Sequence, residues 1–119
     1  MARIDSFNFG FIVVDGKQYA YDVVILPDST VRERERGKGR VGSHSITRRE
    51  IETICEFQPD VIMVGTGESE LLTLSADARE YVEEADLTLF RMPSSQAVKR
   101  FNQLTEEGRR VAALIHITC

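Results

Sequence analysis

The sequence predicts an α/β fold with three layers, in which a mixed β-sheet carries an N-terminal antiparallel hairpin and βαβ units. Three observations support this prediction. Residues 59–67, Pro-Asp-Val-Ile-Met-Val-Gly-Thr-Gly, form a short apolar run closed by glycines, which is typical of a central strand of such a sheet. Asp15-Gly16 separates two runs rich in β-branched and aromatic residues. Helical and strand patterns then alternate through the second half of the chain.

Length and composition indicate one domain over residues 1–119. Fifteen Lys and Arg against nineteen Asp and Glu give a net charge of −4, which argues against general nucleic-acid binding. Cys55 and Cys119 show neither disulfide-framework nor zinc spacing, so a reducing interior is favoured. No apolar run reaches the roughly 18 residues of a membrane span, and the first residues lack a signal-peptide core. We expect a cytoplasmic protein.

The N-terminal third is expected to be β-structure. Residues 9–14 and 18–26 form the two predicted strands of the hairpin, because Asp15-Gly16 readily adopts the positive φ angles of a type I′ turn. A short strand over residues 31–34 is expected after the Pro27-Asp28-Ser29 turn. Residues 35–45 contain three glycines and almost nothing to bury, which predicts a mobile loop.

The first predicted helix begins with a capping box formed by Thr47 and Glu50, with Ile46 and Ile51 as its hydrophobic staple. Its buried stripe is expected to contain Ile51, Ile54 and Cys55, and Pro59 stops it. The strand over residues 61–64 follows, and residues 71–74 are expected to pack irregularly.

Ser75 is predicted to cap a second helix with Ala78, Tyr81, Val82 and Ala85 on one face. Residues 87–92 are the next expected strand, parallel to the strand over 61–64 because a right-handed helical crossover joins them. Ser94 or Ser95 is predicted to cap a third helix that ends at Gly108, with an inward face made of Ala97, Val98, Phe101 and Leu104. Residues 111–117 close the sheet.

Residues throughout the chain resemble a small family of α/β proteins of unassigned biochemical role. Its relatives include the adipogenesis-associated domain protein and a mitochondrial complex I assembly factor. The resemblance rests on Gly10, Tyr19 to Asp22, Pro27-Asp28, Arg32, the His44 region, Val64-Gly65-Thr66-Gly67, Met92, Ala97, Asn102 and Arg109-Arg110-Val111-Ala112-Ala113. It implies a three-layer fold, small oligomers, and no established substrate or cofactor. The assembly role belongs to one branch, and the sequence shows no mitochondrial transit pattern.

The loop Gly65-Thr66-Gly67, with Glu68 after it, is the first candidate ligand site. It follows a predicted strand at the sheet edge where α/β proteins tend to bind ligands. A dinucleotide fingerprint would need glycine at position 70, where the chain has Glu70, and the Gly-Lys-Ser/Thr of a P-loop is absent. A tight turn explains the glycines equally well.

A basic segment could complete such a site. Arg32, Arg34, Arg36, Lys38 and Arg40 alternate along the chain, and Arg48 and Arg49 follow. If the segment folds over the glycine loop, Arg32 or Arg34 could clamp a carboxylate or phosphate. The simpler interpretation is a solvated loop that protects an edge strand. Aromatic residues are not interleaved with these charges, which argues against nucleic-acid binding.

No catalytic or metal constellation is recognisable. His44 could act as an acid or base with Glu68, although a histidine in such a loop more often bonds a backbone group. His116 is expected to be structural or at a subunit contact, and two distant histidines do not make a metal site. The serines and threonines lack a nucleophile elbow. We therefore assign no catalytic residue, metal or cofactor.

Two further polar residues are expected to be structural. Asp22 lies where its strand becomes buried, and it needs a partner, which Arg109 or Arg110 could supply. Asn102 is expected to bond a loop backbone and shape the cleft.

The leading hypothesis is a non-enzymatic protein-interaction or assembly factor with an unidentified protein partner. The alternative is a small anionic-ligand binder or enzyme at Gly65-Thr66-Gly67, with Arg32 and His44. A third alternative is that the conspicuous residues serve folding and self-association.

Overall fold

The computed structural model describes residues 2–34 and 45–118. The strands in this part of the chain are β1 (Ile4–Asn8), β2 (Phe11–Val14), β3 (Lys17–Tyr19), β4 (Val23–Ile25), β5 (Val31–Glu33), β6 (Ser45–Ile46), β7 (Val61–Gly65), β8 (Thr73–Leu74), β9 (Leu89–Met92) and β10 (Val111–Ile115). The helices are α1 (Arg48–Cys55), α2 (Ala76–Glu84) and α3 (Ser94–Glu106). The loop expected at 35–45 lies outside the described residues apart from Ser45, which begins β6.

The main sheet is mixed and has the strand order β5-β4-β10-β7-β9. β10 and β9 both run parallel to β7, whereas β4 is antiparallel to β10 and β5 is antiparallel to β4. Every residue of β7 and β10 is buried. The interior strand predicted at 61–64 is therefore confirmed, as is its parallel pairing with the next strand, although β10 holds the middle of the sheet.

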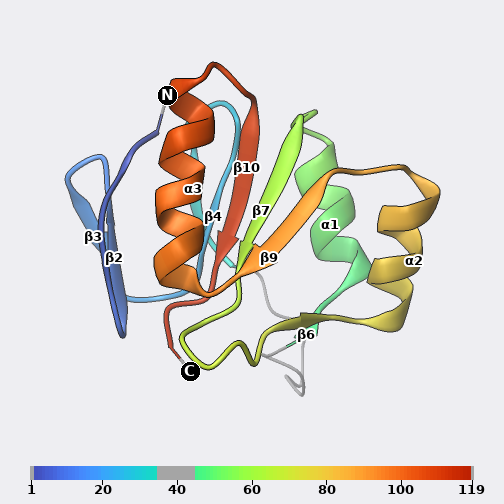
Figure 1. Ribbon diagram of the computed structural model, residues 1–119, viewed down its shortest axis with the longest axis horizontal. Coiled ribbons are helices and arrows are strands. Elements are labelled where there is room, and N and C mark those ends of the chain that lie inside the picture. Colours follow the sequence, from blue (N-terminus) through green and yellow to red (C-terminus); the bar gives the residue numbers. More distant parts are fainter. Residues whose placement is uncertain (1, 35–44, 119) are drawn as a thin grey trace.

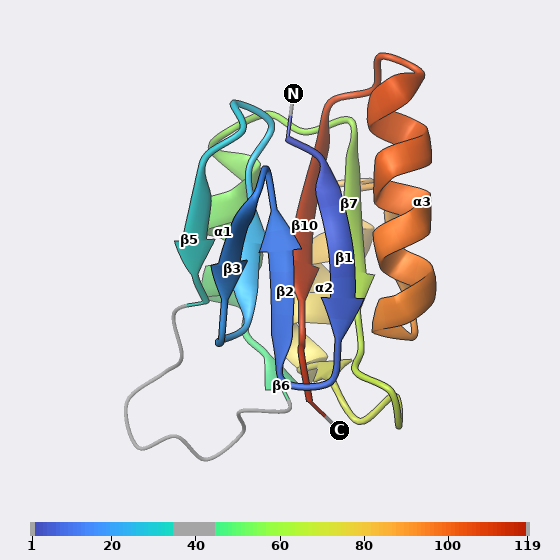
Figure 2. The same cartoon turned by 90° about the vertical axis from the view of Figure 1, so that its left-hand side faces the viewer.

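Two apolar cores separate three layers, as the sequence predicts (Figure 1). On one face of the main sheet, α3 and the three-stranded sheet β1-β2-β3 pack over residues such as Met63, Ala113 and Ile115. On the other face, α1 and α2 pack over residues such as Val64 and Leu114. Figure 2 shows the small sheet beside α3 on the outer side of the first core.

The predicted hairpin forms, but its second strand is shorter than expected. Asp15 and Gly16 have φ angles of 49° and 81°, and β2 pairs antiparallel with β3 across them. The single strand expected over 18–26 is wrong: β3 ends at Tyr19, and β4 begins at Val23 in the main sheet. The alternation of residues along the chain could not predict this break. The break occurs where Asp22, between β3 of the small sheet and β4 of the main sheet, is buried.

Three strands were not expected from the sequence. β1 is an antiparallel neighbour of β2 and buries only Ile4 fully, so it carries little apolar pattern. β6 and β8 form a two-stranded parallel ladder, with Ile46 opposite Leu74. This ladder gives residues 73–74 a regular structure where irregular packing was expected.

The helix signals near α1 and α2 are confirmed. The Thr47 hydroxyl accepts from the Glu50 backbone N–H, and the Glu50 side chain accepts from the Thr47 N–H, which completes the capping box. Ser75 caps α2 through the Ala78 N–H. Ile51 and Ile54 are buried as expected, whereas Cys55 is half-buried and Ala85 is exposed.

Candidate functional site

The glycine loop after β7 is occupied by contacts within the protein. The Ser94 hydroxyl accepts from the Gly67 N–H at 2.9 Å and donates to the His116 carbonyl at 2.6 Å. The Thr66 N–H and hydroxyl both donate to the Met92 carbonyl, at 2.9 and 3.1 Å. A Cβ on Gly65 would lie 2.8 Å from Ser94 Oγ and 3.1 Å from Ser94 Cα. The close approach of α3 therefore explains this glycine without a ligand.

Ser94 does not have the role that the sequence predicts for it. Pro93 occupies the N-cap position of α3, no side chain caps the helix there, and Ser94 is the first helical residue. Proline at the helix start needs no N–H partner of its own. The Ser94 side chain is fully buried and turns towards Gly67 and His116 instead. It fastens the glycine loop to the end of β10.

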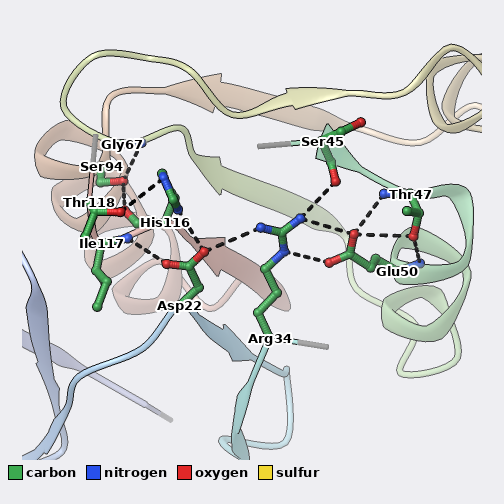
Figure 3. Close-up of polar contacts among 10 residues, drawn as sticks. All are labelled: Asp22, Arg34, Ser45, Thr47, Glu50, Gly67, Ser94, His116, Ile117 and Thr118. Atoms are coloured by element: carbon green, nitrogen blue, oxygen red, sulfur yellow. Dashed lines mark hydrogen bonds and ion pairs between the residues drawn. The ribbon is translucent and has the colours of Figure 1, made fainter. Parts of the chain in front are cut away.

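A buried ionic cluster lies directly behind this loop (Figure 3). Asp22 Oδ2 lies 2.8 Å from His116 Nδ1 and 3.4 Å from Arg34 Nη1, and Asp22 Oδ1 accepts from the Ile117 N–H at 3.0 Å. The side chains of Asp22, Arg34 and His116 are at most 5% exposed. The predicted pairing of Asp22 with Arg109 or Arg110 is wrong, because Arg110 instead binds the carbonyls of Phe57 and Gln58.

Arg34 joins this cluster to the start of α1. Its Nε donates to Glu50 Oε1 at 2.7 Å, and its Nη2 donates to the Ser45 carbonyl at 2.9 Å. Glu50 thus completes the capping box and also balances a buried guanidinium. Because Asp22, Arg34 and His116 lie next to the ends of β4, β5 and β10, and Glu50 lies in α1, the cluster holds together segments that are far apart in the sequence.

The electrostatics favour an ionised Asp22. Burial alone would raise the pKa of the Asp22 carboxyl, but the hydrogen bonds from His116 and Ile117 and the electrostatic effect of the neighbouring His116 and Arg34 outweigh it. The pKa of Asp22 therefore lies below its usual value. A buried carboxylate is tolerated here because its lone pairs are occupied and its charge is balanced.

The Asp22–His116 pair has the residue order of a catalytic relay, in which a carboxylate binds the Nδ1 side of a histidine ring. Asp22 Oδ2 lies 2.8 Å from His116 Nδ1, and the Thr118 hydroxyl lies 3.5 Å from His116 Nε2. Proton transfer needs a separation of about 2.6–3.2 Å between the heavy atoms. The Thr118 hydroxyl is therefore too far from His116 Nε2 for direct proton transfer, whereas the bond to Asp22 holds the His116 ring in position.

A groove of about 400 Å³ lies elsewhere, between α1 and the β4–β5 edge of the main sheet. Its apolar lining includes Val24, Leu26 and Ile54. Arg32 lines it too, and the Arg32 guanidinium lies 5.1 Å from the centre of the Phe57 ring. The other charged and polar residues of the lining are Glu33, Arg49, Glu50, Thr53 and Glu56.

The predicted site residues fall into three places. The segment Gly65-Thr66-Gly67 is connected to Arg34 through His116 and Asp22, since the His116 N–H donates to the Gly65 carbonyl at 3.0 Å. Arg32 lies in the groove instead. Asn102 lies on α3, where its side chain bonds both the N–H and the carbonyl of Ile4 in β1.

The two remaining predicted site residues are Glu68 and His44. Glu68 is exposed in the loop after β7, and His44 lies outside the described residues. Ligand binding by any of these residues stays a prediction. Sequence reasoning gave Ser94 a capping role and left His116 without its partner. The one signal for a His116–Asp22 pair was that each is a lone polar residue in an otherwise apolar run.

Two classes of feature are absent from residues 2–34 and 45–118. Within those ranges, no cluster of three or more His, Cys, Asp or Glu side chains is arranged to hold a metal ion. No helix there combines the length and the apolar character that crossing a bilayer requires.

Known proteins similar to this chain share its fold over nearly its whole length. A family model described as "Protein of unknown function (DUF498/DUF598)" matches residues 4–116. A conserved hypothetical protein from Pyrococcus horikoshii OT3 is 31% identical, with a TM-score of 0.84 over 98% of this chain and 99% of that one. A protein named MT938 is 30% identical, with a TM-score of 0.82 over 100% of both chains. An outer membrane protein from Bartonella henselae is 27% identical, with a TM-score of 0.81 over 99% of this chain and 96% of that one.

Proposed function

The chain belongs to the DUF498/DUF598 family of proteins of unknown function, and from this premise we propose that it is a non-enzymatic protein-interaction domain of the assembly-factor kind. The observation that carries the proposal is a division of roles at the carboxyl end of β7. The polar side chains there bond to the fold itself, whereas large apolar side chains beside them are exposed. Membership also confirms the predicted resemblance to a small α/β family of unassigned role.

The proposed contact surface is the rim formed by the β1–β2 turn, the loop over residues 66–72 and the segment after β10. These three segments lie along one edge of the molecule (Figures 1 and 2). The Gly10 N–H donates to the Ile117 carbonyl at 2.7 Å, and the Leu72 N–H closes the loop on the Thr66 carbonyl at 3.2 Å. Such backbone bonds fix the shape of the rim before any partner arrives.

Two apolar side chains project from this rim. Phe9 is 65% exposed and Leu71 is 50% exposed. Single exposed apolar residues are common, but two of them along one edge of the molecule provide the kind of anchor that protein interfaces use. We name this surface, defined by Phe9 and Leu71, the apolar rim.

The resemblance to a complex I assembly factor supports an assembly role by analogy, and the partner of this chain is an unidentified protein. We also propose a cytoplasmic location, supported by two widely separated cysteines. The name of the Bartonella relative, an outer membrane protein, points to another location for that protein. Fractionation of cells followed by immunodetection tests the location, and recovery with the envelope would contradict it.

Site-specific photo-crosslinking in the producing cells tests the interaction. A photoreactive phenylalanine analogue is placed at Phe9 or Leu71, and at Lys17 and Gln18 of β3 as exposed controls. We expect one discrete adduct from the two rim positions and none of that mass from the control positions. Equal labelling at all four positions, or no adduct from the rim, would overturn the proposal.

A second candidate function is binding of a small anionic ligand, and the groove beside β5 favours it. From the sequence, this alternative is expected at Gly65-Thr66-Gly67. In the structure the Gly67 N–H already donates to the Ser94 hydroxyl. The groove is lined by both arginines, Arg32 and Arg49, and by apolar side chains, and its volume lies within the range of ligand pockets. Three glutamates in its lining work against a highly charged anion, so a monocarboxylate with an apolar tail fits best.

A thermal-shift screen with fatty and aromatic monocarboxylates, nucleotides and sugar phosphates tests this second candidate. A ligand at about a hundred times its dissociation constant adds roughly 2.7 kcal/mol of stability. We expect the shift to disappear in Arg32→Gln and to persist in Arg100→Gln, whose guanidinium lies on α3 and contacts Gln103. A silent screen, or a shift indifferent to Arg32→Gln, would remove support for the groove.

A further inference from the structure

β9 is an open edge of the main sheet. It pairs with β7, and no other strand in the described part of the chain pairs with it. The Ile62 N–H donates to the Thr88 carbonyl and the Thr66 N–H donates to the Met92 carbonyl, both at 2.9 Å. Alternate residues of a strand direct their backbone groups to the same side. The N–H and carbonyl groups of Leu89 and Arg91 therefore point away from the sheet.

This edge is more apolar than the open edges formed by β5 and β3. β5 presents the charges of Arg32 and Glu33, and β3 begins Lys17-Gln18, as is usual for strands that avoid pairing. β9 reads Leu-Phe-Arg-Met, and Phe90 is 40% exposed at its middle. An apolar edge of this kind pairs readily with another strand. In Figure 1, β9 lies on the side of the sheet nearest the reader.

We propose that β9 is the contact through which two copies of this chain associate, as antiparallel strands related by a two-fold axis at Phe90. In this register Leu89 of one copy faces Arg91 of the other, and both pairs exchange their outward N–H and carbonyl groups. The two main sheets become one continuous sheet. The two Phe90 side chains meet across the axis on the face covered by α3, because Phe90 alternates with Leu89, which packs in the α1–α2 core.

The chain disfavours the neighbouring registers. A two-fold axis at Leu89 would pair Arg91 with Leu87, whose N–H already donates to the Val82 carbonyl at 3.0 Å. An axis at Arg91 would pair Leu89 with Pro93, which has no N–H, and would set two arginines directly opposite each other. The Phe90 register satisfies all the outward backbone groups of Leu89 and Arg91.

The occupant is a second copy because the edge is complementary to itself in this register. The contact is short, so it falls in the size range of weak, concentration-dependent interfaces. Its outward backbone groups belong to Leu89 and Arg91, and neither Phe9 nor Leu71 lies in β9. Failure of this inference therefore leaves the proposed interaction function standing, and the reverse also holds.

Disulfide trapping tests the register. In a Cys55→Ser, Cys119→Ser background, Phe90→Cys places two thiols at a non-hydrogen-bonded pair with a Cα–Cα distance of about 4.5 Å, which a disulfide spans. Leu89→Cys and Arg91→Cys serve as matched controls, because neither residue faces its own copy. With oxidised glutathione, we expect Phe90→Cys to form a covalent dimer about tenfold faster than either control. Equal rates for all three would overturn the register.

Sedimentation equilibrium over a range of concentrations tests the association itself. Arg91→Pro removes an N–H that points away from β7, so the internal ladder is kept while two bonds across the axis are lost. We expect the dimer to weaken by about tenfold. Glu33→Pro is the control at the opposite edge of the sheet. The Arg34 N–H donates to the Asp22 carbonyl and the Leu26 N–H donates to the Thr30 carbonyl. Alternate residues of β5 therefore bond to β4, and the Glu33 N–H points away from it.

Circular dichroism and thermal melting establish that both proline variants are folded. The inference is overturned if the wild type remains monomeric at all concentrations, or if folded Arg91→Pro associates as well as Glu33→Pro. If Arg91→Pro does not fold, Phe90→Lys replaces it, since two lysines facing each other across the axis should also abolish the dimer. A Phe90→Lys dimer of wild-type strength would overturn the inference.

Discussion

Replacing Asp22 by asparagine isolates the buried ionic cluster, because the change keeps the size of the side chain and removes its charge. The new amide presents its NH₂ group either to Arg34 and His116 or to the Ile117 N–H, so at least one present contact becomes unfavourable. Hydrogen bonds to a charged group are worth about 1.5–3 kcal/mol each, and breaking a buried ion pair costs about 3–5 kcal/mol. Glu50 still balances Arg34, which limits the loss. We expect Asp22→Asn to lower the free energy of unfolding by about 2–4 kcal/mol.

Chemical denaturation at neutral pH measures this loss, with Asp28→Asn as the matched control. Asp28 is an exposed turn residue that accepts from the Thr30 N–H, and its pKa is also lowered, chiefly by a hydrogen bond with the Thr30 side chain and then by the bond from the Thr30 N–H. Solvent screens an exposed carboxylate, so we expect a much smaller change from Asp28→Asn. Equal losses for the two variants, or a loss below about 1 kcal/mol for Asp22→Asn, would refute the reasoning.

The stability difference between the wild type and Asp22→Asn should depend on pH. The pKa of Asp22 is lower in the folded protein than in the unfolded chain, so its stabilising contribution is complete above the unfolded value of about 4 and is lost as the pH falls through the folded value. The difference in stability between the wild type and Asp22→Asn should therefore shrink on acidification below about pH 4. A difference that stays constant down to about pH 2 would contradict this assignment.

Three further changes test other contacts. Gly65→Ala should cost about 1–3 kcal/mol in denaturant unfolding, because the new Cβ meets Ser94 Oγ at 2.8 Å; an unchanged midpoint would show that α3 can move aside. Asn102→Ala removes both bonds to the Ile4 backbone, so hydrogen exchange of the Ile4 amide should accelerate by about tenfold, and unchanged exchange would mean that α3 does not hold β1. Burial raises the pKa of the Cys55 thiol, so its alkylation near pH 8, followed by mass spectrometry, should be several-fold slower than that of glutathione; an equal rate would contradict the burial.

The elements that the sequence predicts well have local causes. The capping box at Thr47 and Glu50, the Asp15-Gly16 turn and the apolar run ending at Gly65 each lie within a few residues of the structure that they specify. The sequence does not predict β1, because this strand has no local signal of that kind. It buries Ile4 and little else, and it is held by β2 and by Asn102.

The candidate site was harder to predict because its contacts are distant in the sequence. Asp22 and His116 are 94 positions apart, and they meet because β4 and β10 are neighbours in the sheet, which no local pattern specifies. Ser94 follows a strand and starts a helix. Its local sequence is therefore the same whether its hydroxyl caps that helix or, as observed, bonds the Gly67 N–H in the interior. Arg34 looks like one of several alternating surface arginines, yet Glu50 and Asp22 bury it.

The central claim is that the polar groups behind β7 serve folding, whereas the apolar rim serves interaction. One paired measurement of stability and of rim crosslinking tests it, with Ser94→Ala and Leu71→Ser both carrying the photoreactive analogue at Phe9. We predict that Ser94→Ala loses about 1–3 kcal/mol of unfolding free energy but keeps the discrete adduct, and that Leu71→Ser keeps its stability but loses the adduct. A stable Ser94→Ala that no longer forms the adduct, together with a Leu71→Ser that still forms it, would contradict the claim.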